Sequence, residues 1–255
     1  MNRDFTVRKY SELLDAFKEA NYRFQTFRDF LKHPLDRVVI LRHDVDKLPL
    51  NSLNFAKLEK DKGINASYFF RSVPYSYKPS VIRAIEKMGH EIGYHYEVMN
   101  QANGDVYKAL EMFNQNLVKF RNVAKIETIC MHGSPMSKYD NRELWNKFNY
   151  YNYGIIGEPY FDIDYSKVLY LTDTGRSWSN EETNIRDKVE SPFFYEIKNT
   201  DQLIELILIK ELPNQIMLNT HPQRWNDDFI KWVKELVWQN VKNQVKRLVS
   251  RRFHR

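Results

Sequence analysis

The sequence predicts an α/β fold in which a parallel sheet closes into a barrel. About six short apolar segments alternate with segments of helical periodicity, a pattern typical of βαβ units. No glycine-rich nucleotide-binding loop follows a predicted strand, which favours a barrel over a dinucleotide-binding sheet. The chain has 255 residues, of which 42% are hydrophobic and 15% aromatic, so it is long enough to bury a substantial core.

Apolar patterning places the elements in order. We expect an opening helix at 10–20 and a short strand or edge hairpin at 22–27. Strands are expected at 38–43, 66–70, 91–97, 126–131, 168–172 and 215–219. Helices are expected at 51–62, 79–88, 104–122, 141–149, 203–210 and 225–252. No domain boundary is visible, so we expect one domain over 1–255, with an N-terminal extension at 1–35 and a basic C-terminal helix at 225–255.

Composition narrows the class of protein. A single cysteine, Cys130, excludes an internal disulfide framework and any multi-cysteine metal site. Neither a signal peptide nor a membrane-spanning stretch is visible, which leads us to expect a cytoplasmic protein without a membrane span. The net charge of +6 is concentrated after Val241. A basic tail could bind nucleic acid, but a solvated helix end is the commoner explanation, and nucleic acid is not the expected partner.

Polar residues follow the first core strand abruptly. The apolar run 38–41 passes into Arg42, His43, Asp44, Val45 and Asp46. Because side chains alternate along a strand, Asp44 and Asp46 share one face and His43 takes the other. Two carboxylates on one face repel each other unless a cation or a shared proton offsets the charge. The alternative is a pair of turn aspartates that caps the next helix.

Four later strands also end in polar residues. They supply His95 and Glu97, His132, then Asp173, Arg176 and Trp178, and finally His221, Arg224 and Trp225. Each group alone could be turn chemistry. The carboxyl ends of parallel strands meet at one end of a barrel, however, and there these groups would form an active site.

These residue types suit metal-assisted hydrolysis. Asp46, His95 and a third ligand would hold a divalent cation, and a mixed nitrogen and oxygen set suits zinc, with manganese, cobalt and iron also compatible. Asp44 would accept the proton of the attacking water, and His221 would protonate the leaving group. Trp178, Arg224 and Trp225 could line a sugar-sized pocket, although core packing is the commoner role of a tryptophan.

The ordered motifs resemble those of the polysaccharide deacetylases, carbohydrate esterase family 4. They are His43 to Asp46, Gly89 to His95, His132 to Pro135, Thr172 to Arg176 and Asn219 to His221. The resemblance covers about 36–225 and implies a distorted (β/α)7-type barrel that hydrolyses acetyl groups on sugars. It also implies that Asp44 is the base, Asp46 and His95 are metal ligands and His221 is the acid. Asp173, Arg176 and Trp178 fall where the family has residues that orient the base and the acid.

The sequence departs from this family at three places. A valine separates the two aspartates, as in a branch of the family that acts on peptidoglycan or cyclic amides. Met99 stands where the second metal histidine is expected, so that Glu97 or His132 would have to replace it. The Arg-x-Pro motif that usually orients the base is replaced by residues 132–135.

Three functions are therefore compared. The first is a metal-dependent deacetylase that acts on an acetylated sugar, a nucleotide-sugar or a glycan precursor. The second is a hydrolase of the same fold that opens a cyclic amide or imide, for which a small, dry pocket is expected. The third is a non-catalytic sugar-binding or nucleic-acid-binding relative, suggested by Met99 and the basic tail.

Overall fold

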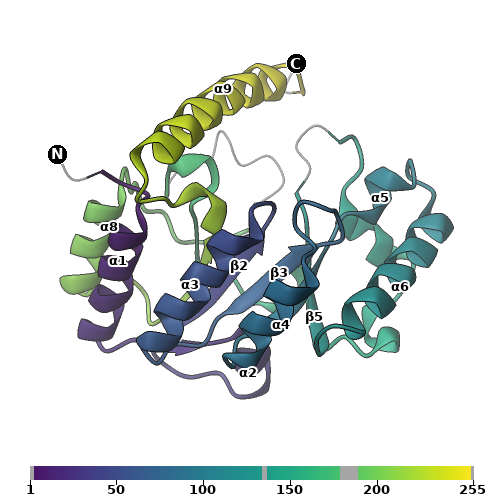
Figure 1. The fold of residues 1–255 in the computed structure, drawn as a ribbon, viewed down its shortest axis with the longest axis horizontal. Helices are drawn as coiled ribbons and strands as arrows, with labels where there is room; N and C mark the ends of the chain where they lie inside the picture. Colours follow the sequence, from purple (N-terminus) through teal and green to yellow (C-terminus); the bar gives the residue numbers. More distant parts are fainter. Residues whose placement is uncertain (1–2, 134–136, 179–188, 254–255) are drawn as a thin grey trace.

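The computed structural model describes residues 3–133, 137–178 and 189–253, and the side chains as far as residue 244. At its centre is a parallel seven-stranded sheet of order β5-β4-β3-β2-β7-β6, with β1 beside β2 (Figure 1). The strands are β1 (Arg23–Gln25), β2 (Val38–Val45), β3 (Ser67–Arg71), β4 (Glu91–Tyr96), β5 (Ile126–Met131), β6 (Leu169–Thr172) and β7 (Gln215–Thr220). The predicted α/β class with a parallel sheet is confirmed.

The barrel is not closed by strand pairing within the described residues, because β5 and β6 are the two ends of the sheet order. On the outer edge of β5, a bridge pairs Thr128 with Gly157. The backbone NH of Ile156 also donates to the oxygen of Glu127 at 2.7 Å. A short stretch of loop therefore continues the sheet where a further strand would close it.

Strand β2 organises the sheet. Its first half pairs with β1 and its second half with β3 along one edge, while β7 pairs along the other edge. All eight residues are buried. This double pairing explains why the sequence of β2 is a continuous apolar run rather than an alternating one.

The two faces of β2 carry different chemistry. On the outer face His43 lies 2.8 Å from Glu59 and 2.7 Å from the hydroxyl of Thr220. Glu59 also accepts hydrogen bonds from the hydroxyls of Tyr10 and Tyr68, both at 2.6 Å. All of these groups are buried and contact one another, so this network is a structural one. Alternation along β2 therefore turns the neighbouring aspartate inward, as predicted.

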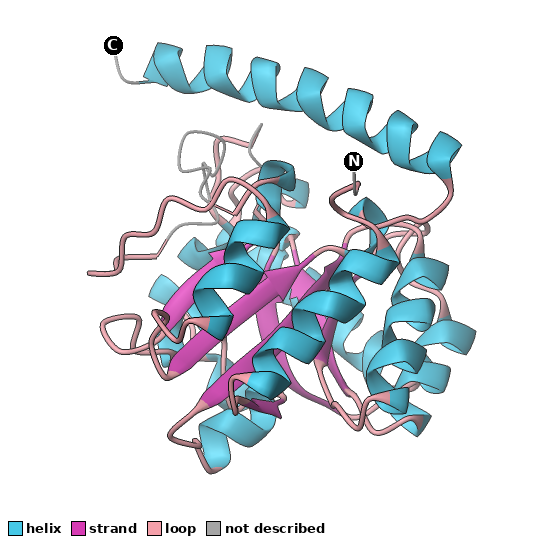
Figure 2. Ribbon diagram, turned by 90° about the vertical axis from the view of Figure 1, so that its left-hand side faces the viewer, coloured by secondary structure: helices cyan, strands magenta, loops and turns pink. Residues whose placement is uncertain are grey.

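Helices surround the sheet (Figures 1 and 2). They are α1 (Val7–Glu19), α2 (Phe27–Lys32), α3 (Pro49–Asp61), α4 (Pro79–Lys87), α5 (Val98–Gln101), α6 (Val106–Arg121), α7 (Pro159–Asp162), α8 (Thr200–Leu208) and α9 (Phe229–Phe253). In Figure 1, α1 and α8 lie side by side at one flank, and α5 and α6 cover the other. None of the described helices combines the length and the apolar character that crossing a membrane requires.

The structure differs from the predicted elements in a few places. The segment expected as a strand or hairpin is the three-residue β1 followed by α2, whose N-terminus is capped by the hydroxyl of Thr26. The helix expected at 141–149 is instead two short 3-10 helices, Asn141–Asn146 and Tyr150–Tyr153. The last helix begins at Phe229 rather than Trp225, because Pro222–Arg224 forms a separate turn.

Helix α9 lies apart from the helices that cover the sheet. Both views show it crossing the end of the molecule toward which the strands point. It is fastened by Trp232, whose indole NH donates to the oxygen of Asp4 at 2.6 Å, and by Asn243, which donates to the oxygen of Gly175 at 2.9 Å. This position places α9 over the carboxyl ends of the strands.

Candidate metal centre and active site

The polar residues at the strand ends line one cavity of about 1610 Å³. Asp44 and Asp46 come from the end of β2, and His95 from β4. His132 follows β5, and His221 follows β7. The parallel sheet therefore brings together five residues that are spread over most of the chain, at the end of the barrel where sequence patterning predicts a site.

Three of these residues form a potential metal-binding group. Ligand atoms of Asp46, His95 and His132 all lie within 4.8 Å of one another. Oδ1 of Asp46 is 3.4 Å from Nε2 of His132 and 3.8 Å from Nε2 of His95. That oxygen is buried without a hydrogen-bond partner among the described residues. A buried carboxylate oxygen between two imidazole nitrogens fits a divalent cation, and three protein ligands leave positions open for water and substrate.

Both histidines are oriented by a second partner. Nδ1 of His95 lies 3.0 Å from the oxygen of Cys130, which fixes the hydrogen on Nδ1 and turns the lone pair of Nε2 into the site. Burial lowers the pKa of His95 to about 4, so the ring is neutral at neutral pH. Nδ1 of His132 is 3.3 Å from Oε2 of Glu97. A carboxylate or carbonyl behind each ring is the usual support of metal-binding histidines.

Glu97 therefore occupies a different place from the one predicted. Its carboxylate is bound by the guanidinium of Arg71 at 3.0 and 2.6 Å and lies behind His132, not among the ligand atoms. Burial opposes ionisation, but His132 and Arg71 lower the pKa of Glu97 to about 2. Met99 is buried in the core. Of the two predicted substitutes for the missing histidine, His132 is the one that joins the ligand group.

A second group within ligand distance consists of Asp44, His95 and Cys130. Both oxygens of Asp44 are already engaged, because Arg42 donates to them at 2.9 and 2.7 Å and Asn219 donates at 3.1 Å. The Cys130 thiol faces the oxygen of Met131 at 3.5 Å. Asp46, His95 and His132 are consequently the better set for a cation.

The pairing with Arg42 keeps Asp44 ionised. Burial acts to raise the pKa of Asp44, but the Arg42 guanidinium and nearby histidines hold it well below its usual range. Among the described residues Oδ1 accepts a hydrogen bond from Arg42 alone, which leaves it one further lone pair. Sequence reasoning did not assign this role to Arg42. The signal was its position two residues before Asp44, which places both side chains on the same face of β2.

His221 is held by a buried carboxylate. Its Nδ1 lies 2.6 Å from Oδ1 of Asp173, which also accepts from the guanidinium of Arg224 at 2.7 Å. Oδ2 of Asp173 accepts from the indole NH of Trp225 at 2.7 Å. Nε2 of His221 faces the ligand group, 3.9 Å from Oδ2 of Asp46. Asp173 thus lies behind His221, while Arg224 also lines the cavity.

In contrast to the prediction, Trp178 and Trp225 do not wall the cavity. Trp178 is buried, and its indole NH donates to Thr200 at 3.0 Å. Trp225 is 1% exposed and packs in the core, with only its NH turned toward Asp173. Arg176 lies over the ring of Phe5 and donates to a backbone oxygen at 3.2 Å. The tryptophan that does line the cavity is Trp238 of α9.

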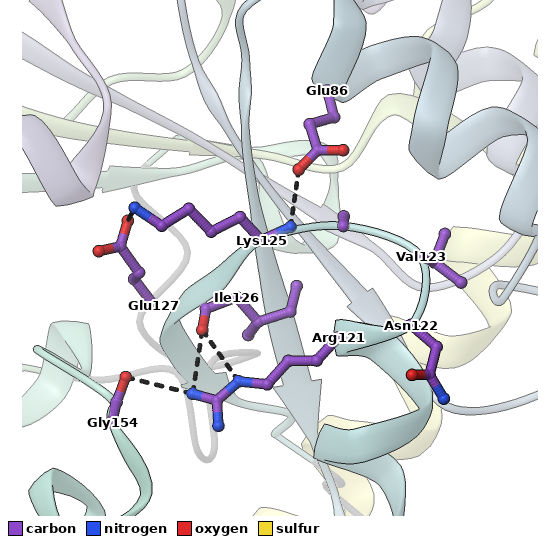
Figure 3. Close-up of a pocket in the computed structure, with 9 residues that line it drawn as sticks. Glu86, Arg121, Asn122, Val123, Lys125, Ile126, Glu127 and Gly154 are labelled. Carbon is purple, nitrogen blue, oxygen red and sulfur yellow. Dashed lines mark hydrogen bonds and ion pairs between the residues drawn. The ribbon is translucent and has the colours of Figure 1, made fainter.

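A smaller depression lies at the opposite end of the strands, near the start of β5 (Figure 3). The Arg121 guanidinium there binds the oxygens of Ile126 and Gly154, at 3.1 and 3.2 Å. Glu86 accepts from the backbone NH of Lys125 at 2.7 Å, and the Lys125 ammonium pairs with Glu127 at 2.9 Å. Because these charged groups are already paired locally, this depression has the character of a structural junction.

No protein-family model matches this chain, and no curated protein matches it. Among solved structures the chain is similar to Bacillus subtilis PdaA, described as a family 4 carbohydrate esterase. The identity is 11%, the TM-score is 0.39 and the match covers 89% of each chain. A TM-score at this level carries no argument about function, so nothing is transferred from that protein to this chain.

Proposed function

We propose that the protein is a metal-dependent hydrolase that removes an acetyl group from a sugar or glycan precursor. One observation carries the proposal: the ligand group Asp46, His95 and His132 lies in one cavity with Asp44 and with His221. Metal ligands, a carboxylate and an oriented histidine are the parts that metal-assisted hydrolysis needs. The order of the motifs, which resembles that of polysaccharide deacetylases, supports the same reaction.

Asp46, His95 and His132 would hold the cation. A divalent cation at this position supplies Lewis acidity, which polarises the acyl carbonyl and makes water a better nucleophile. Two nitrogens and one oxygen suit zinc, and manganese, cobalt and iron are compatible with the same set.

The two proton transfers fall to Asp44 and His221. Asp44 would accept the proton of the attacking water on the lone pair that Oδ1 retains. Nδ1 of His221 is held at 2.6 Å by Asp173, so Nε2 is the atom that would give a proton to the departing nitrogen or oxygen. The buried Asp173 carboxylate holds the ring in the orientation that turns Nε2 toward the cavity.

The size of the cavity distinguishes a hydrolase of sugars from a hydrolase of cyclic amides. A cyclic amide hydrolase is expected to have a small, dry pocket, whereas this cavity of about 1610 Å³ opens beneath α9. It exceeds the roughly 300–1,000 Å³ of ordinary small-molecule sites. This volume favours a sugar or a longer glycan. The third ligand His132 in turn weakens the argument for a non-catalytic relative, which rested on Met99.

The test is metal content together with acetate release. We expect about one equivalent of a transition metal in the wild type, lost in Asp46→Ala, His95→Ala and His132→Ala. Met99→Leu is the matched control, since it keeps an apolar side chain of similar volume and leaves the ligands in place. Acetate release from N-acetylated sugars should follow the metal content, and circular dichroism shows whether each variant is folded.

Two outcomes would contradict the proposed metal site. If the wild type contains no metal and takes up none on incubation with zinc, the hydrolase mechanism fails. A metal that survives in His132→Ala but is lost in Cys130→Ala would move the site to the group Asp44, His95 and Cys130.

A further inference from the structure

Helix α9 supplies one wall of the cavity. Its residues Lys231, Lys234, Glu235, Trp238, Gln239 and Lys242 line the cavity. The helix lies across the carboxyl ends of the strands, over the site (Figures 1 and 2). Because α9 lines the same cavity as Asp44, Asp46 and His221, it is well placed to contact a substrate.

Positive charge predominates on this wall. Lys47 pairs with Glu235 at 3.1 Å. Lys242 is half-buried and forms no ion pair with any carboxylate in the part of the chain that the structure describes. Burial lowers the pKa of Lys242 and the charges of Lys47 and Arg224 lower it further, while Glu235 and Asp46 act in the opposite direction. A partly desolvated ammonium beside other cations carries an electrostatic cost that a bound anion would remove.

The cavity acids offset these cations only in part, since Glu235 is also paired with Lys47 at 3.1 Å. Asp44 is already paired with Arg42, with its carboxylate 2.7 Å from the guanidinium. Asp46 lies in the ligand group, where a cation would take up its charge. Lys234 adds a further exposed ammonium to the same wall. The space beneath α9 is therefore suited to a negatively charged group.

The same turn of α9 presents an aromatic ring. Trp238 lines the cavity with 53% of its surface exposed. The ammonium of Lys242 lies 5.3 Å from the centre of this ring. An exposed indole offers a flat apolar face for the CH groups of a sugar ring, and the neighbouring ammonium can bind an anionic substituent of the same sugar.

We infer that Trp238, Lys234 and Lys242 form a subsite for an acylated sugar that bears an anionic group, either a phosphate or a carboxylate. The part of this inference that concerns the acyl group rests on the proposed function. The charge preference rests on α9 alone. Trp238 stacks on the sugar ring, and the two lysines bind the anion.

The experiment compares four probes by isothermal titration calorimetry on the full chain. They are N-acetylglucosamine, N-acetylglucosamine 1-phosphate, N-acetylglucosaminuronic acid and inorganic phosphate. Each titration is run with and without EDTA, so that binding of an anion to a metal is separated from binding to α9. The phosphate and carboxylate probes show which anion the subsite prefers. The variants are Lys242→Gln, Lys242→Arg, Lys234→Gln and Trp238→Ala. The control is Lys108→Gln, which changes an exposed lysine on α6.

We expect at least one anionic sugar to bind ~10-fold or more tightly than the neutral sugar, because hydrogen bonds to charged groups are stronger than neutral ones. This preference should disappear in Lys242→Gln, persist in Lys242→Arg and Lys108→Gln, and weaken with added salt. Trp238→Ala should weaken all three sugars but not inorganic phosphate. Equal binding of neutral and anionic sugars, or an unchanged preference in both Lys242→Gln and Lys234→Gln, would overturn the inference.

The two proposals fail separately. If the protein binds no metal but prefers anionic sugars through Lys242, the hydrolase proposal is refuted and the subsite stands. If metal and acetate release are present but neutral and anionic sugars bind equally, the hydrolase stands and the subsite is refuted.

Discussion

Replacing Asp173 by asparagine tests whether this carboxylate holds His221, Arg224 and Trp225 in place. Asp173 is fully buried and accepts four hydrogen bonds, two from His221 and one each from Arg224 and Trp225. Asparagine offers one oxygen in place of two, so two of the four donors would face its NH₂ group. Each lost buried hydrogen bond costs about 1–3 kcal/mol, which gives an expected loss of about 2–6 kcal/mol.

The pH dependence of this loss sharpens the test. Burial acts to raise the pKa of Asp173, but Arg224 and His221 lower it below the ordinary value. A lowered carboxyl pKa stabilises the fold above the unfolded pKa, and that stabilisation is lost as pH falls through the folded one. Urea unfolding at neutral pH should therefore show the full difference between wild type and Asp173→Asn, and the difference should shrink in acid. A difference below about 1 kcal/mol at neutral pH would refute this account of Asp173.

Three further changes probe other parts of the structure. Glu97→Gln should weaken zinc affinity about 10–100-fold in a chelator competition, since Glu97 supports His132; unchanged affinity would contradict this role. Burial lowers the pKa of His95 to about 4, so the metal-free fold should lose stability as pH falls from about 6.5 to 4. In His95→Gln this loss, about 3 kcal/mol in the wild type, should be absent from the plot of unfolding free energy against pH. Gly93→Ala would place a Cβ 2.3 Å from the ring of Phe69. Thermal unfolding should therefore show that the free energy of unfolding falls by about 1–3 kcal/mol. An unchanged melting temperature would show that the ring can move aside.

The sheet could be predicted from sequence because its signals are local. The buried run of β2 and the helix stop at Gly63 are properties of a few neighbouring residues. The alternation of His43 and Asp44 also follows from strand geometry alone, and it separates the outer hydrogen-bond network from the inner site. The meeting of polar strand ends then follows from the parallel arrangement.

The remaining features depend on contacts between distant residues. Nothing near Trp178 indicates that its partner is Thr200, and nothing near Trp238 indicates that it faces a cavity built from other strands. The length of α9 could be read from the sequence, but its position across the site is set by contacts with Asp4 and Gly175. Periodicity carries no information about such contacts, and so it did not identify Trp238 as the tryptophan that lines the cavity.

The pairing of β2 also sets an order in which the parts can assemble. The partners of β2 along one edge, β1 and β3, lie close to it in the chain, whereas its other neighbour, β7, begins only at Gln215. Closing so long a loop is slow compared with local pairing. During synthesis, Asp46, His95 and His132 are therefore all present before His221 is made. Docking of β7 brings His221 to the cavity last, so under the proposed function an unfinished chain would hold the ligand group before it held the proposed proton donor.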